Sequence, residues 1–259
     1  MLPKPKQLTP ENAARFQDPE LVDFYHLRLP YPEQTFDILV ALIRDQPGTV
    51  LDIGAGTGEI ARGLAGKAER VDAVDFSAAM IERGKRLPGS RHVNWILGPA
   101  ESVALRPPYT LITAGDSLHW MDWEAVLPRF GRLLSPNGVV AIVTRWELPA
   151  PWQELLNKLI RRYSIMKAYE QFDLAEELEK RDLFRKLGEK ETSPHLSNQR
   201  IDDYINSFHS RSSLALSAMP AEEAQAFDEA LREAVLPWSH DSSLTLETQA
   251  RVVCGRPLP

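Results

Sequence analysis

The sequence is poor in cysteine and in long apolar runs. Its single cysteine, Cys254, has no partner for an intrachain disulfide and cannot form a cysteine-based metal cluster. No stretch approaches the roughly 20 consecutive apolar residues of a membrane-spanning helix. The polar segment 1–18 also lacks the apolar run of a secretory signal. These absences predict a cytoplasmic protein that has no membrane partner and binds no metal.

Dense clusters of basic residues are missing as well. The formal net charge is −6, and no window of the sequence concentrates Lys and Arg. Nucleic-acid binding requires such a concentration of cations to neutralise phosphates, so no nucleic-acid partner is expected. The 259 residues contain no internal repeat and are enough for one large α/β domain, with or without a cap.

The first 145 residues alternate between short β-branched strands and amphipathic helices. Strands are expected at 49–53, 71–76, 93–97, 109–114 and 139–144, and helices at 33–46, 59–68 and 122–134. This alternation is typical of a parallel, doubly wound sheet. Later, helices are expected at 152–167, 174–187, 198–208 and 222–235, with a weak strand near 189–195 and a closing strand at 244–253. A helical block inserted so late suggests a cap over the carboxyl ends of the strands, where such folds bind ligands.

The sharpest motif is the glycine-rich turn after the first strand, VLDIGAGTG at 50–58. Gly54, Gly56 and Gly58 let the backbone turn tightly and let a ligand approach it closely. A dinucleotide fingerprint needs glycine at the sixth position counted from Gly54, where this chain has Glu59. A carboxylate there opposes a pyrophosphate at the helix N-terminus. The turn therefore favours a ligand without phosphate over NAD.

Two carboxylates flank this turn. Asp52 precedes it and suits a ligand with an ammonium or sulfonium group nearby, whereas Asp75 ends the second strand and can accept from a ribose diol. Phe76 follows and is expected to contact an adenine, although a core aromatic would look the same. S-adenosyl-L-methionine carries all these groups and no phosphate. We therefore expect it as the cofactor, with S-adenosyl-L-homocysteine as the product.

The segment 50–145 resembles the core of the class I S-adenosylmethionine-dependent methyltransferases, in the small-molecule subgroup that includes trans-aconitate methyltransferase. VLDIGAGTGEIARGL is similar to the first motif of that family and VDAVDFSAAMI to its second. GPAESVAL resembles the adenine-edge segment, and DSLHWMDW the segment after the fourth strand. FYHLRLPYP is similar to the subgroup's lead-in, and HSRSSLA to a Ser-rich stretch of its cap.

The resemblance implies a Rossmann-like, seven-stranded sheet that is mostly parallel, with the last strand antiparallel. We expect an N-terminal lid at 1–35, a cofactor-binding core at 36–146, a helical cap with room for a sheet strand at 147–240, and the closing strand of the core sheet at 241–259. The implied cofactor-binding residues are Asp52, Gly54, Ala55, Gly56, Gly58, Asp75, Phe76, Ala100, Glu101, Asp116 and Ser117.

Two residues depart from the family pattern. Pro99 stands where many relatives have an Asp that accepts from the adenine amino group, so Glu101 or the backbone must supply that contact. Asp116 stands where subgroup members often carry Gln, and it adds a negative charge near the cofactor or the substrate.

The pair His119-Trp120 follows the fourth strand, close to the expected position of the methyl group. His119 is a candidate general base, with a purely site-lining role as the alternative. By the resemblance, Tyr25 and Arg28 are candidate catalytic residues in a lid over the cofactor, where Arg28 reaches a carboxylate; a solvated arm is the alternative. The candidate substrate-lining residues are Tyr31, Trp120, His209 and Arg211.

Methyl transfer from a sulfonium is an in-line displacement that depends on positioning and desolvation and needs no covalent nucleophile. The sequence therefore predicts methyl transfer to an O or N atom of a small molecule by a monomer or homodimer. One alternative is an RNA or protein methyltransferase, which needs a basic or grooved surface. Another is a non-catalytic S-adenosylmethionine-binding protein, which the extra carboxylate of Asp116 keeps open.

Overall fold

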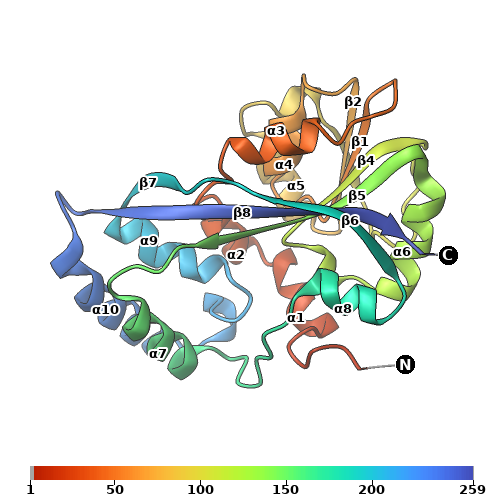
Figure 1. Ribbon diagram of the computed structural model, residues 1–259. Helices are drawn as coiled ribbons and strands as arrows, with labels where there is room; N and C mark the ends of the chain where they lie inside the picture. Colours follow the sequence, from red (N-terminus) through yellow and green to blue (C-terminus); the bar gives the residue numbers. More distant parts are fainter. Residues whose placement is uncertain (1–2, 259) are drawn as a thin grey trace.

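A computed structural model describes residues 3–258 of the chain. Residues 1 and 2, which open the expected 1–35 lid, and residue 259, which ends the expected closing strand, lie outside the described residues. A central sheet carries helices on both faces, and a second group of helices gathers around the far ends of its longest strands (Figure 1).

The strands are β1 (Thr49–Ile53), β2 (Arg70–Asp75), β3 (Asn94–Leu97), β4 (Tyr109–Gly115), β5 (Leu134–Glu147), β6 (Phe184–Glu191), β7 (His195–Arg200) and β8 (Ser243–Pro257). The α-helices are α1 (Pro10–Ala14), α2 (Pro19–Tyr25), α3 (Gln34–Val40), α4 (Glu59–Leu64), α5 (Ala78–Lys85), α6 (Trp123–Leu133), α7 (Gln153–Tyr163), α8 (Leu174–Lys180), α9 (Ile201–Ser207) and α10 (Ala221–Val235). Short 3-10 helices include Arg15–Gln17, Leu118–Trp120 and Phe208–Ser210.

The strand order across the sheet is β3-β2-β1-β4-β5-β8-β6, and β7 also pairs with β8. Strands β1 to β5 are parallel, and β8 runs antiparallel to β5. This confirms the predicted doubly wound α/β class with an antiparallel last strand. Within residues 3–258 the sheet has eight strands rather than seven, because β6 pairs with residues 251–257 of β8 and β7 with residues 243–248. Together β6 and β7 form one interrupted edge at the seventh position.

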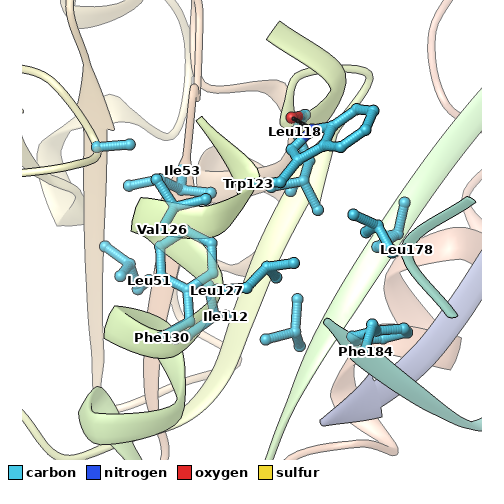
Figure 2. Packing of buried hydrophobic residues seen from close by; sticks show 14 of the residues in the cluster. Leu51, Ile53, Ile112, Leu118, Trp123, Val126, Leu127, Phe130, Leu178 and Phe184 are labelled. Atoms are coloured by element: carbon cyan, nitrogen blue, oxygen red, sulfur yellow. Dashed lines mark hydrogen bonds between the residues drawn. The ribbon is translucent and has the colours of Figure 1, made fainter. Parts of the chain in front are cut away.

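Alternate residues of the central strands supply two separate cores, as the two-residue period of a strand requires. Leu51 and Ile53 belong to one buried cluster, which also contains Trp123 and Phe130 of α6 and Leu178 of α8 (Figure 2). The opposite face of the same strands, which includes Val50, packs on α3 and α4. Both faces of the central strands are therefore covered by packed side chains. Space for a ligand is left at the ends of these strands.

The long strands β5 and β8 extend beyond the parallel core and carry the cap helices α7, α9 and α10 (Figure 1). Leu244 and Leu246 of β8 share a buried cluster with residues of those helices, including Tyr204, Phe208 and Phe227. The cap is therefore built on the same strands as the core.

Two expected helices are corrected by the pairing along β8. The helix expected over 174–187 ends at Lys180, and β6 begins at Phe184. The helix expected over 198–208 begins at Ile201, because residues 195–200 form β7. In both places hydrogen bonds to β8 outweigh a helical apolar spacing, since tertiary pairing overrides local propensity.

Candidate functional site

The glycine-rich turn joins β1 to α4 and bends over the carboxyl end of the sheet. Gly54, Gly56 and Gly58 all have positive φ, at 61°, 57° and 73°. A Cβ on Gly58 would lie 2.3 Å from the Trp95 ring, so glycine is required there by both the backbone conformation and the packing.

Asp75 at the end of β2 is bound to this turn. Its Oδ2 accepts from the Gly56 N–H at 2.7 Å, and its Oδ1 accepts from the Ser77 N–H at 2.8 Å. The side chain is 5% exposed, and burial raises the pKa of its carboxyl. These two bonds hold the carboxylate in one orientation beside the turn.

Asp52 lies beneath the turn. Its carboxylate accepts from the Thr113 hydroxyl at 2.8 Å and from the Ala61 N–H at 3.0 Å, and burial raises its pKa to about 7. It borders only a small hollow of about 20 Å³. Its contacts therefore join β1 to β4 and α4, and its assignment to the cofactor site stays a prediction.

A first cavity of about 410 Å³ opens beside Asp75 and the turn. Its predicted lining residues are Tyr25, Arg28, Gly54, Gly56, Asp75, Phe76, Ala100, Glu101, Asp116, Ser117 and Trp120. Ala55 and Gly58 belong to the turn but are not among the lining residues. Phe76 is 37% exposed, so its ring is available to a ligand. The volume is in the range of small-ligand pockets.

The N-terminal segment forms one wall of the first cavity, through Pro10, Ala13, Ala14, Phe16 and Gln17. Hydrogen bonds to the cap hold this segment in place: Gln7 donates to the Glu170 carbonyl at 2.6 Å, and Arg15 donates to the Ser212 carbonyl at 2.9 Å. Sequence reasoning placed a lid here but missed Phe16, because a lone aromatic in a polar segment carries no periodic signal.

A second cavity of about 500 Å³ lies between the sheet and the cap. It shares Phe16, Arg28, Asp116 and Trp120 with the first cavity, so these four residues mark the junction of the two. The other lining residues include His119, Arg145, Glu147, Gln153, Asn157 and Arg211. Arg145, Gln153 and Asn157 were missed by the sequence reasoning because they come from β5 and α7, far from the recognisable motifs.

Three arginines line the second cavity, and they differ in their partners. Arg145 pairs with Glu59 at 3.0 Å, and Arg211 pairs with Glu147 at 3.3 Å. Arg28 differs: its guanidinium donates to Ser210 and stacks 4.3 Å from the Tyr25 ring centroid. Within residues 3–258 no carboxylate forms an ion pair with Arg28. Its charge is therefore available to a ligand.

Asp116 borders both cavities at their junction and lies close to Tyr31, Arg145 and Arg28. The Tyr31 hydroxyl donates to Asp116 Oδ2 at 2.8 Å, and the Arg145 guanidinium stacks 4.3 Å from the Tyr31 ring centroid. Burial raises the pKa of Asp116, although the charges of Arg145 and Arg28 and the bond from Tyr31 oppose that shift. Tyr31 itself is 6% exposed and borders only the small hollow beneath the turn, so the structure places it behind Asp116 and not in the second cavity.

His119 borders the second cavity with its ring tilted against Trp120, at a centroid distance of 4.8 Å. Burial, with the nearby charge of Arg28, lowers its pKa to about 4. The imidazole is therefore neutral near pH 7, and it is a weak proton acceptor because basicity falls with the pKa.

His209 was predicted to line the substrate site, and the structure corrects this. Its ring is 1% exposed, and its two nitrogens face Leu214 and Asp228. It is absent from the lining of both large cavities. The helix that carries it turns the ring into the cap, where it packs against Phe24 and Phe227.

Two further observations concern the described part of the chain. Within residues 3–258, no three His, Cys, Asp or Glu side chains are grouped to hold a metal ion. None of the described helices combines the length and apolar content needed to cross a bilayer.

Comparison with known proteins gives a consistent result. Residues 50–138 match the methyltransferase domain family. An uncharacterised methyltransferase of Schizosaccharomyces pombe is 27% identical over 150 residues, which are 55% of this chain and 58% of that protein. The next curated relatives, from Mycobacterium, are matched over 49% of their length, so the chain spans about half the length of the curated relatives it matches.

Two solved structures share the fold. One, from Anaeromyxobacter dehalogenans and provisionally described as a type II methyltransferase, is 26% identical with a TM-score of 0.64, covering 90% of this chain and 99% of the other. A methyltransferase from Geobacter sulfurreducens, solved with S-adenosyl-L-homocysteine, is 15% identical with a TM-score of 0.51, covering 96% and 99%.

Proposed function

We propose that the chain is a class I S-adenosylmethionine-dependent methyltransferase that transfers a methyl group to an O or N atom of a small molecule. The observation that carries the proposal is the junction of the two cavities. One cavity lies against the glycine-rich turn, the other against the cap, and they meet at Phe16, Arg28, Asp116 and Trp120.

In this proposal the first cavity holds the cofactor, which supplies the methyl group on a sulfonium. Asp75 accepts from the ribose hydroxyls, and its orientation is set in advance by the N–H groups of Gly56 and Ser77. Phe76 and Ala100 contact the adenine, and Glu101 borders the same end of the cavity. The narrower resemblance to trans-aconitate methyltransferase stays a prediction.

The second cavity receives the acceptor molecule. Arg28 has no carboxylate partner among the described residues, so an anionic group of the acceptor can bind it without displacing an existing ion pair. The aromatic rings of Phe16 and Trp120 border the same junction and exclude water from the reacting atoms. These features favour a partly aromatic or anionic small molecule.

His119 lines the acceptor cavity as a neutral imidazole in this proposal. A group with a pKa of about 4 has little tendency to take a proton at pH 7. We therefore favour its positioning role over its role as general base. Replacing His119 by Ala then raises the KM for the acceptor more than it lowers kcat, whereas loss of a base lowers kcat.

The first test is calorimetric titration with S-adenosyl-L-homocysteine, with NAD as the control ligand. One-to-one binding in the micromolar range with NAD inert supports the cofactor assignment, and absence of binding contradicts it. Labelled S-adenosyl-L-methionine is then incubated with pools of aromatic carboxylates, neutral analogues, total RNA and protein. Label in the carboxylate pool supports the proposal, label only in RNA or protein overturns the small-molecule part, and binding without transfer in any pool supports a non-catalytic protein.

A further inference from the structure

Residues 209–214, which we call the serine loop, connect the cap to Arg28, which borders both cavities, and to Arg15 in the N-terminal segment that walls the first. Ser210 accepts two hydrogen bonds from Arg28, from Nε to its Oγ at 2.9 Å and from Nη2 to its carbonyl at 2.6 Å. The Ser212 carbonyl accepts from Arg15 Nη1 at 2.9 Å. The position of the serine loop therefore sets the direction of Arg28 and anchors the N-terminal wall of the first cavity.

His209, the first residue of the serine loop, holds that loop to α10. Its Nδ1 lies 2.9 Å from the Leu214 carbonyl oxygen, and its Nε2 lies 3.0 Å from Asp228 Oδ1. The ring packs between Phe24 of α2 and Phe227 of α10, with centroid distances of 5.6 and 6.2 Å. Both ring nitrogens thus face hydrogen-bond acceptors in a closely packed site.

A neutral imidazole cannot satisfy this arrangement. It has one N–H and one lone pair, so either tautomer sets a lone pair against an oxygen about 3 Å away. One additional proton removes the conflict, because the imidazolium donates to both oxygens and its charge is balanced by Asp228. The imidazole is a stronger base than a carboxylate, so the proton resides on His209.

We propose that His209 is a positioning residue: as an imidazolium bound to Asp228, it holds the serine loop and, through Ser210, directs Arg28 at the junction of the two cavities. The inference rests on the proposed function, because that function gives Arg28 a ligand to meet. The reaction itself does not use this proton.

The charged groups that face the ring agree with this protonation state. They are Asp228 on α10 and Glu20 on α2, both acidic. Burial alone would lower the pKa of His209, but the bonds to Asp228 and Leu214 and the charges of Asp228 and Glu20 raise it. The stabilising ion pair between His209 and Asp228 is therefore fully formed below about pH 6.5, the ordinary pKa of histidine. It is lost as the pH rises through the raised pKa of His209.

The decisive variant is Asp228→Asn. The introduced amide can donate to Nε2 of a neutral imidazole while Nδ1–H donates to the Leu214 carbonyl, so the arrangement no longer needs the extra proton. The matched control is Asp202→Asn, which removes a carboxylate from the ion pair between Asp202 of α9 and Arg232 of α10 and leaves the serine loop untouched.

Binding of S-adenosyl-L-homocysteine reports on the serine loop, because Arg28 also lines the first cavity and the N-terminal wall of that cavity is anchored at Ser212. It is measured by calorimetry at about pH 6.5 and about pH 8.5, at and well above the ordinary pKa of histidine. In the wild-type protein and in Asp202→Asn, we expect the Kd for S-adenosyl-L-homocysteine to be about fivefold or more higher at the higher pH. This factor is at the lower end of usual coupling between sites. In Asp228→Asn we expect a change below about twofold. A pH dependence in Asp228→Asn equal to that of the wild type overturns the inference.

A second measurement does not depend on cofactor binding or on a variant. The ring nitrogens of His209 are titrated by NMR in the wild-type protein, and we expect a pKa above the ordinary histidine value of about 6.5, because both nitrogens face hydrogen-bond acceptors. A pKa below that value overturns the inference even if the variants fail to fold. If the wild type fails to bind S-adenosyl-L-homocysteine at about pH 6.5, the proposed function fails instead, and the NMR titration still decides the protonation of His209.

Discussion

Replacing Asp75 by Asn tests the cofactor site with a change of one atom. The carboxylate accepts from the Gly56 N–H with one oxygen and from the Ser77 N–H with the other, and it is 5% exposed beside the first cavity. An amide offers one oxygen, so one backbone N–H loses its acceptor and the ligand loses a charged acceptor.

The expected size of both effects follows from these contacts. A buried donor left without a partner costs about 1–3 kcal/mol of folding free energy. A hydrogen bond to a charged group contributes about 1.5–3 kcal/mol, so its loss raises the Kd for S-adenosyl-L-homocysteine by about 10- to 150-fold. Calorimetry measures the affinity, and denaturant unfolding measures the stability.

Asp72 provides the matched control on the same strand. It is fully buried, accepts from the Tyr109 hydroxyl at 2.6 Å and from Asn94 Nδ2 at 3.0 Å, and borders neither large cavity. Asp72→Asn should lower the stability by a similar amount and leave the affinity unchanged. A Kd for Asp75→Asn within about twofold of the wild-type value would falsify the ribose assignment, because a charged contact cannot be lost at so small a cost.

Three further predictions concern single side chains. Gly58→Ala should lower the unfolding free energy by at least about 2 kcal/mol in denaturant titrations, because φ is +73° and the new Cβ meets Trp95 at 2.3 Å; unchanged stability contradicts the packing. His119, with a pKa of about 4, should show no NMR titration between pH 5 and 9, and a midpoint near 6.5 would contradict its burial. Because burial raises the pKa of Asp52 to about 7, wild-type stability should fall as the pH rises from about 4 to 7, and Asp52→Asn should lack this part of the slope; equal slopes contradict the assignment.

The part of the candidate site around the first cavity could be predicted from the sequence because many of its residues lie in local motifs. Asp75 and Phe76 follow directly from a buried strand, and the carboxyl ends of neighbouring parallel strands meet at one edge of the sheet. The turn at 54–58 follows β1 in the same way. A residue that directly follows a predicted parallel strand can therefore be placed at the carboxyl edge of the sheet from the sequence alone.

The second cavity depends on segments that meet only in three dimensions. Phe16, Arg28 and Arg145 come from the N-terminal segment and from β5, and no short motif connects them. His209 lies in a recognisable Ser-rich stretch, but only the packing of α10 decides that its ring turns toward Asp228. Its true neighbours could not be inferred from residues next to it in the chain.

The parallel core could be predicted from the sequence alone. The apolar period of each strand and the glycine-rich turn each depend only on residues that are close together in the chain. The secondary structure of residues 174–208 could not be predicted in this way. Their apolar spacing is helical, but strands begin at Phe184 and His195. Those strands form because β8, whose paired residues lie 43 to 73 positions later in the chain, offers an edge to them. Hydrogen bonds made at such a distance in sequence leave no local signal, so this edge of the sheet had to be seen in the structure.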